Sequence, residues 1–218
     1  MKILCLHGFR NSGNLLNKSM LSLEKKVKKD NIYFDFITSP FLYKKTSSEP
    51  FDYEENTFYQ WWSTSKEGLF NEENYDTLYE SIEYIYKLVI LNNYDGILGS
   101  SQGSVLTQII LFLQEYPLLF DEKFHKFKFS FKFGILGSTF NITDTSLKIL
   151  YDYKINTPIL NIYGKSDQLV PYELSKEFNK KCNNVTSYEH MGKHYIPTTT
   201  EMRKVLLDFL IKKKIEYK

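Results

Sequence analysis

The sequence of 218 residues contains no alanine, and it has only two arginines, Arg10 and Arg203, against 26 lysines. This bias is typical of AT-rich coding, so runs of lysine carry little functional meaning. Arginine supplies most bidentate contacts to bases and phosphates, and its scarcity argues against a nucleic-acid binder. Basic and acidic residues also nearly cancel, leaving a net charge of +2. The composition therefore predicts no nucleic-acid partner.

Cysteines and long apolar runs are equally scarce. Cys5 and Cys182 are the only cysteines and make no disulfide framework, which fits a reducing compartment. No run reaches the roughly 18 apolar residues of a membrane span. The run 3–6 is shorter than a signal-peptide core of about 7–15 residues. We therefore expect no membrane insertion and a cytoplasmic location, with the nucleus as the alternative.

The length fits one domain over residues 1–218, since domains typically have roughly 100–200 residues. The hydrophobic fraction of 42% and the charged fraction of 25% are those of an ordinary folded protein. His and Cys do not cluster, and there is no phosphate-binding loop. We therefore expect neither a metal nor an organic cofactor.

Short apolar runs alternate along the chain with segments of helical periodicity. Strands are predicted at 2–6, 33–37, 96–98, 159–163 and 185–188, and helices at 15–29, 75–91, 102–116, 171–180 and 200–213. In 124–136, phenylalanine at every second position predicts a further strand that starts at the sheet rim and runs inward. This alternation indicates a parallel sheet with helices on both faces. Ligand sites in such sheets lie beyond the carboxyl ends of the strands.

The strongest motif is the pair of glycines around Ser101, at Gly99 and Gly103. It follows a buried strand and opens a helix, the context that a nucleophile elbow requires. Side chains two positions before and after the nucleophile would collide with neighbouring backbone, and glycine removes the collision. Centring the motif on Ser100 would put Leu98 and Gln102 at those positions, so Ser101 is the predicted nucleophile.

A serine hydroxyl needs a neighbouring base, and in this kind of fold the chain order is serine, acid, histidine. That order leaves two histidines. His194 lies in a loop and can swing over Ser101, whereas His190 ends a strand and is interpreted as a structural hydrogen-bonding residue. Asp167, just beyond the strand 159–163, is the predicted acid that orients the imidazole. Asp144 follows an earlier strand and is the alternative.

Acyl transfer also needs donors aimed at the developing oxyanion. One donor is the backbone N–H that follows the nucleophile, at Gln102. The second is expected from a loop after an early strand, where Phe9 follows Gly8. His7 is interpreted as a scaffold residue.

Six segments resemble one family in order along nearly the whole chain: 5–10, 34–37, 61–62, Ser81, 94–103 and 190–197. Together they are similar to the FSH family of serine hydrolases in the α/β-hydrolase superfamily. The resemblance implies a three-layer α/β fold, with a mostly parallel central sheet, helices on both faces and no large lid domain. It also implies catalytic roles for Ser101, Asp167 and His194. Ser100 and Lys193 depart from the residues common in the family, but neither departure removes a catalytic group.

Two features bear on the substrate. Aromatic residues crowd the segment before the long helix, where they could form an apolar wall for an acyl chain or pack as a satellite core: Phe51, Tyr53, Phe58, Tyr59, Trp61, Trp62 and Phe70. Arg10 follows the predicted oxyanion loop and could bind an anionic group or form a structural ion pair. We therefore include Arg10, Trp61 and Trp62 as candidate substrate-binding residues.

The leading hypothesis is a serine hydrolase that cleaves small-molecule carboxylic esters or thioesters through an acyl-enzyme. A peptidase or amidase with the same triad is the second enzymatic hypothesis. The non-enzymatic alternative is a small-lipid or partner-binding protein on a hydrolase scaffold.

Overall fold

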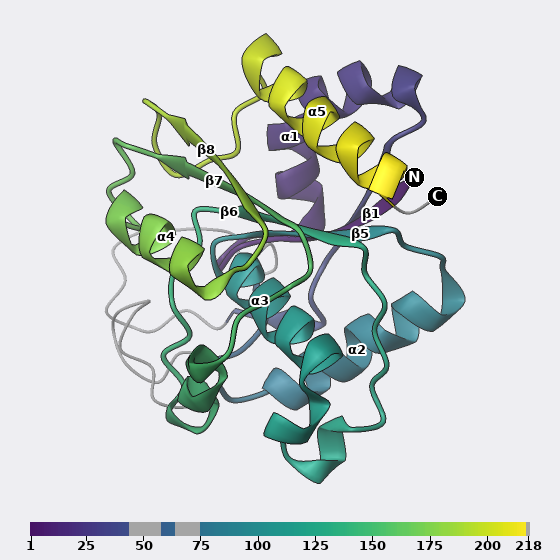
Figure 1. Cartoon of the computed structure of the whole chain (residues 1–218), viewed down its shortest axis with the longest axis vertical. Coiled ribbons are helices and arrows are strands. Elements are labelled where there is room, and N and C mark those ends of the chain that lie inside the picture. Colours follow the sequence, from purple (N-terminus) through teal and green to yellow (C-terminus); the bar gives the residue numbers. More distant parts are fainter. Residues whose placement is uncertain (44–57, 64–74, 217–218) are drawn as a thin grey trace.

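A computed structural model describes residues 1–43, 58–63 and 75–216, and a six-stranded sheet forms its centre (Figure 1). The strands are β1 (Lys2–Leu6), β2 (Tyr33–Ile37), β5 (Gly96–Ser100), β6 (Phe133–Gly137), β7 (Ile159–Gly164) and β8 (Val185–His190). Their order is β2-β1-β5-β6-β7-β8, and every neighbouring pair is parallel. All six carboxyl ends therefore meet at one edge, which we call the carboxyl edge.

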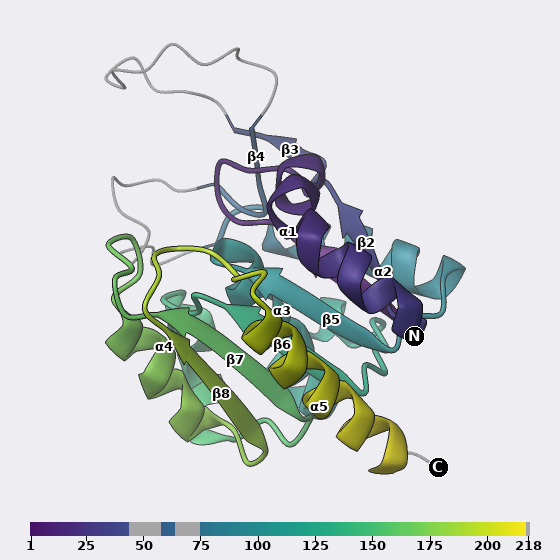
Figure 2. The ribbon, with the colours of Figure 1, turned by 90° about the horizontal axis from the view of Figure 1, so that it is seen from above.

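Helices cover both faces of this sheet. They are α1 (Gly13–Val27), α2 (Leu78–Leu91), α3 (Gln102–Glu115), α4 (Tyr172–Phe178) and α5 (Thr200–Glu216). Figure 1 shows α1 and α5 on one face and α2, α3 and α4 on the other, and α1 and α5 lie in front of the sheet in Figure 2. The predicted three-layer architecture without a large extra domain is confirmed. None of the described helices has the length and apolar character needed to cross a membrane.

The four inner strands β1, β5, β6 and β7 are largely apolar and buried because both faces of the sheet are covered there, whereas the edge strands β2 and β8 carry more polar and exposed residues. In β1, Ile3 and Cys5 pack into the core beneath α1 and α5, whereas Leu4 and Leu6 pack into the core on the α3 side. Successive side chains of a strand point to opposite faces, so one five-residue run contributes to both cores. The sheet is thereby packed against a hydrophobic core on each face, and its carboxyl edge lies between the two layers of helices.

The prediction of a strand over 124–136 is wrong in its first half, because β6 begins only at Phe133. The alternation of burial is real: Phe127, Phe129 and Phe131 are buried, and the residues between them are exposed. However, no strand in the described part of the chain pairs with this stretch. The side-chain amide of Gln114 accepts from Phe131 N at 2.7 Å and donates to Phe131 O at 3.0 Å. A glutamine side chain thus stands where a neighbouring strand would be.

A small second sheet forms between β2 and α2, where the sequence pattern predicts neither a strand nor a helix. It pairs β3 (Phe41–Leu42) with β4 (Tyr59–Gln60) in antiparallel fashion. Tyr59 also makes a two-way backbone bridge to Asn11, in the loop that follows β1. This bridge brings the segment 59–62 to the carboxyl edge. Of the aromatic cluster, Phe51, Tyr53 and Phe70 lie outside the described residues.

Candidate active site

Ser101 occupies the sharp turn between β5 and α3, at the carboxyl edge. Its backbone angles, φ 53° and ψ −121°, are strained for a residue with a side chain. The turn is held in place because Ser101 N donates to Gly137 O at 2.8 Å. A Cβ at Gly99 would lie 2.1 Å from Gly103 O, and a Cβ at Gly103 would lie 2.4 Å from His7 O. The backbone is thus too close for any side chain at either position.

Asp167 and His194 come together from two loops that follow β7 and β8. The Nδ1 atom of His194 lies 2.8 Å from Asp167 Oδ2. The other carboxylate oxygen accepts from Leu169 N and Val170 N, each at 2.9 Å. The Asp167 side chain is only 1% exposed. Burial alone would raise the pKa of Asp167, but the His194 and backbone hydrogen bonds outweigh it and leave the pKa below its usual range.

Ser101 and His194 line the same cavity, which has a volume of about 650 Å³. Among the described residues, no hydrogen bond joins the Ser101 hydroxyl to the imidazole. Such bonds are often long until a substrate binds. The structure therefore places the predicted nucleophile and base at one solvent-accessible hollow, with the acid behind the base.

The two predicted oxyanion donors belong to the two segments next to Ser101, the loop after β1 and the start of α3. The loop after β1 approaches closely, since a Cβ at Gly8 would lie 3.1 Å from Ser101 Cβ. Phe9 follows in this loop and lines the cavity. Gln102 is the first residue of α3. Within the described part of the chain, neither Phe9 N nor Gln102 N has a hydrogen-bond acceptor, so both can serve a ligand.

His7 braces the loop from below. Its Nε2 accepts from Ser39 N at 3.1 Å, so its Nδ1 carries the proton and donates to Gly8 O at 2.7 Å. Burial lowers the pKa of His7 to about 4, although the bond to Gly8 opposes this shift. His7 is therefore neutral, with both ring nitrogens hydrogen-bonded, and this geometry fits the predicted scaffold role.

The two alternatives considered for the base and the acid have other partners. His190 Nδ1 accepts from Gly192 N at 3.1 Å, and His190 O accepts from Lys165 N at 2.7 Å. Burial lowers the pKa of His190. Asp144 accepts from Tyr75 N at 2.7 Å and from Ser146 N at 2.9 Å, capping the 3-10 helix η4 (Thr145–Asp152). Both residues therefore shape loops.

The apolar lining of the cavity that the described residues supply comes from other parts of the chain than the aromatic segment. It is formed by α1 and by the loops that carry Asp167 and His194, through Leu15, Leu16, Leu169, Tyr195 and Ile196. Arg10 lies at its rim, with φ 52° and its guanidinium 5.0 Å from the Tyr43 ring centre.

Trp61 and Trp62 do not line this cavity. Their exposures are 0% and 2%, and both belong to the core on the α2 and α3 side. Trp62 stacks on Tyr75 with ring centres 4.3 Å apart. The geometry favours the core-packing interpretation of these two indoles over direct contact with substrate.

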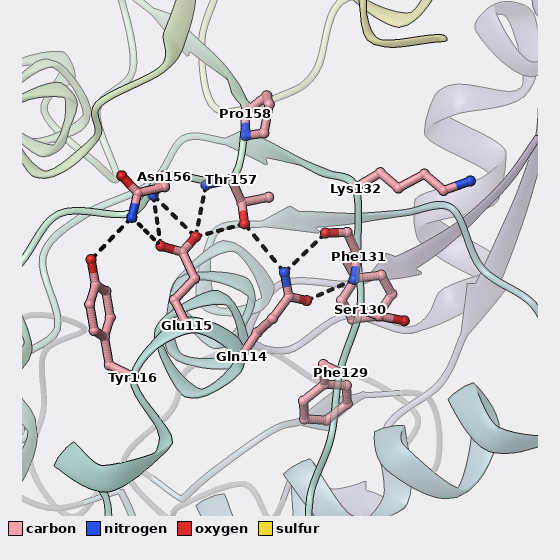
Figure 3. Close-up of a pocket in the computed structure, with 10 residues that line it drawn as sticks. All are labelled: Gln114, Glu115, Tyr116, Phe129, Ser130, Phe131, Lys132, Asn156, Thr157 and Pro158. Atoms are coloured by element: carbon pink, nitrogen blue, oxygen red, sulfur yellow. Dashed lines mark hydrogen bonds between the residues drawn. The ribbon is translucent and has the colours of Figure 1, made fainter. Parts of the chain in front are cut away.

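A second cavity of about 560 Å³ lies at the opposite edge of the sheet, between the end of α3 and the starts of β6 and β7 (Figure 3). Its polar groups are bonded to one another. The Glu115 carboxylate accepts from the backbone N and the side-chain Nδ2 of Asn156 at 2.8 and 2.9 Å. It also accepts from Thr157 N and Thr157 Oγ1, each at 2.7 Å.

No group of three or more His, Cys, Asp and Glu side chains in the described ranges is arranged to hold a metal ion.

The fold, together with a serine in the sharp turn between a strand and a helix, defines an α/β hydrolase. Comparisons with known proteins identify its family. The model of the family described as serine hydrolase (FSH1) matches residues 1–206, and the chain belongs to this family. The resemblance drawn from the sequence is thereby confirmed.

Individual relatives agree with this assignment. Esterase OVCA2 of Danio rerio is 29% identical, with 96% of each chain covered. Two solved structures have the same fold. Arabidopsis thaliana SOBER1 has a TM-score of 0.65 at 19% identity and 98% coverage of both chains. Zea mays acyl-protein thioesterase 2 has a TM-score of 0.66 at 15% identity, covering 97% of this chain and 93% of the other.

Proposed function

We propose that this protein hydrolyses carboxylic esters or thioesters through Ser101, His194 and Asp167, with an acyl-enzyme intermediate. The observation that carries the proposal is the shared cavity. It joins a strained serine to an imidazole whose far nitrogen is held 2.8 Å from a buried carboxylate. Strained geometry of this kind clusters at functional sites.

In the first half of the reaction, Ser101 Oγ attacks the substrate carbonyl carbon while His194 Nε2 accepts the hydroxyl proton. The carbonyl oxygen becomes an oxyanion, which the N–H groups of Phe9 and Gln102 stabilise. Collapse of this intermediate breaks the bond to the leaving oxygen or sulfur. The leaving group takes the proton from His194, and the acyl group remains on Ser101.

In the second half, His194 accepts a proton from water as the water oxygen attacks the acyl-enzyme carbonyl. A second tetrahedral intermediate forms and collapses, releasing the carboxylic acid and returning the proton to Ser101. Asp167 stays ionised throughout, because its pKa lies below its usual range. Its role is to fix the imidazole tautomer and to stabilise the imidazolium.

The cavity wall supports an apolar acyl group as the part of the substrate that binds. Leu15, Leu16, Leu169 and Ile196 surround the space next to Ser101, and apolar lining is typical of small-molecule pockets. The relative named esterase supports ester cleavage. The maize thioesterase shares the fold at low identity, and its name motivates testing thioesters alongside esters.

Steady-state kinetics on p-nitrophenyl esters of increasing chain length, on matched thioesters and on matched anilides would test the proposal. We expect esters or thioesters to be cleaved by the parent and anilides to be cleaved far more slowly. Ser101→Ala, measured in parallel, should be inactive on all of them. Equal or better cleavage of anilides would replace the proposal with an amidase. No turnover of any substrate by folded parent protein would favour the binding-protein alternative.

A further inference from the structure

The segment 59–62 forms a strap across the carboxyl edge, and it binds the loop that carries Phe9. Tyr59 exchanges backbone hydrogen bonds with Asn11 at 2.9 and 3.3 Å. The indole Nε1 of Trp61 donates to His7 O at 2.8 Å. The Trp61 ring also lies against the His7 ring, with centres 5.0 Å apart. The loop is therefore fixed to the strap both before and after Phe9.

The same strap binds Gln102, the other predicted oxyanion donor. Trp61 N donates to Gln102 Oε1 at 2.9 Å, and Gln102 Nε2 donates to Trp62 O at 3.1 Å. These two bonds engage both ends of the amide, and the residue is 1% exposed. The start of α3 is thus tied to the strap by the side chain of the residue whose backbone N–H is the predicted donor.

Trp61 is itself anchored from behind by α2 and the residue that precedes it. Its carbonyl oxygen accepts from Ser81 Oγ and, at 3.2 Å, from Thr77 Oγ1. All three polar groups of Trp61 are therefore bonded, and the residue is 0% exposed. Buried hydrogen bonds in a closed network rigidify the groups that they join.

We propose that Trp61 is a positioning residue that sets the separation of the Phe9 and Gln102 N–H groups. The inference rests on the proposed function, since it concerns the oxyanion donors of that reaction. The two donors belong to segments far apart in the sequence. Trp61 reaches one through its indole and the other through its backbone. Donors stabilise an oxyanion only when they are held about 2.7–3.1 Å from its position before the reaction starts.

Trp61→Phe tests this role, because it removes the bond to His7 O and keeps a large aromatic ring. We expect kcat to fall about 10- to 100-fold with KM little changed, the signature of an interaction made in the transition state. Affinity for a trifluoromethyl ketone, which forms a tetrahedral adduct, should fall by a similar factor. The pH profile of kcat/KM should stay that of the parent, because Asp167 and His194 keep their contacts.

Phe127→Leu is the control for loss of buried aromatic packing. Phe127 lies in the same core cluster and contacts the rings of Tyr79 and Tyr86, away from the cavity. We expect it to lower the melting temperature while kcat and the ketone affinity stay at parent values. This variant separates a stability defect from a misplaced donor.

Gln102→Met provides a second route if Trp61→Phe does not fold. It removes both amide bonds to the strap at nearly constant volume and leaves the backbone N–H in place. We expect the same loss in kcat without a change in KM. In the double variant, kcat should fall no further than in the more impaired single variant, because both substitutions disrupt the same hydrogen-bond network.

The proposal is overturned if folded Trp61→Phe and Gln102→Met both keep the parent kcat and ketone affinity. It is also overturned if their losses appear in KM alone. These outcomes differ from a failure of the proposed function, in which the parent itself does not hydrolyse esters or thioesters, or Ser101→Ala hydrolyses them at the parent rate.

Discussion

The two edges of the sheet carry cavities of similar size and opposite character. At the carboxyl edge, Phe9 N and Gln102 N lack acceptors among the described residues, and Ser101 is held in a strained turn. At the other edge, Glu115 accepts from Asn156 and Thr157, and Gln114 satisfies the backbone of Phe131 (Figure 3). Cavity volume therefore does not mark the site.

The difference lies in what is left unpaired. Buried polar groups are normally hydrogen-bonded, and the edge with the Glu115 network follows this rule. The carboxyl edge satisfies the groups that support the site, such as His7 and Asp167, and leaves Phe9 N and Gln102 N without an acceptor in the described ranges. Electrostatic catalysis requires N–H donors that are available to the substrate and are held in place by hydrogen-bonded neighbours.

Removal of the nucleophile should give the largest effect at the carboxyl edge. For Ser101→Ala we expect kcat on a p-nitrophenyl ester to fall at least about 10⁴-fold, since the hydroxyl is the group that forms the acyl-enzyme. The melting temperature should stay close to that of the parent. A loss smaller than about tenfold in folded protein would remove Ser101 from the mechanism.

Asp167→Asn should give the next largest effect. The amide cannot stabilise an imidazolium and favours the wrong tautomer, so kcat should fall about 10³- to 10⁴-fold. Asp144→Asn is the matched control, because Asp144 bonds to Tyr75 and Ser146. Comparable activity loss in both variants, or loss only in Asp144→Asn, would mean that the acid is misassigned.

Protonation of His7 should make the free energy of unfolding depend on pH. The folded pKa of His7, about 4, lies below the ordinary 6.5, so between these values the unfolded chain binds more protons. The free energy of unfolding should therefore fall as the pH drops from 6.5 to 4, by about 3 kcal/mol from His7. His190, whose pKa is also lowered, acts in the same direction.

Denaturant unfolding of His7→Gln at pH 7 and pH 4.5 would measure this contribution. The variant should be less stable than the parent at pH 7 and should lose less stability on acidification. An equal pH dependence in both proteins would show that His7 is not buried in its neutral form.

The opposite edge should respond in stability alone. Glu115→Ala leaves the Asn156 and Thr157 donors without their acceptor, and we expect it to cost about 1–3 kcal/mol of unfolding free energy. Its kcat should equal that of the parent. The exposed Glu122→Ala is the control, expected within about 0.5 kcal/mol of the parent. A large kcat loss in Glu115→Ala would break the distinction between the two edges.

The sequence predicted features that depend on local sterics and strand order. Gly99 and Gly103 point to Ser101 because their neighbours leave no space for a Cβ. The order of the parallel strands is enough to place Asp167 and His194 at the same edge. The resemblance of six segments indicated the family, and the alternation of strands and helices predicted the layered fold; both are confirmed.

Contacts between distant side chains and backbone were not predictable. Gln114 takes the place of a strand partner for Phe131, and β6 begins only at Phe133. Trp61, a candidate for either substrate contact or core packing, donates to His7 O from a fully buried position. No local pattern signals either bond, because each joins residues that are close only after folding.

The central claim is that Ser101 is the nucleophile of a catalytic triad. Intact-protein mass spectrometry after reaction with a fluorophosphonate, followed by peptide mapping, tests it most directly. We expect one adduct per chain, located on Ser101, with labelling slowed strongly in Asp167→Asn and retained in Ser100→Ala. An adduct on Ser100 or on another residue, or no adduct on folded and ester-hydrolysing protein, would contradict it.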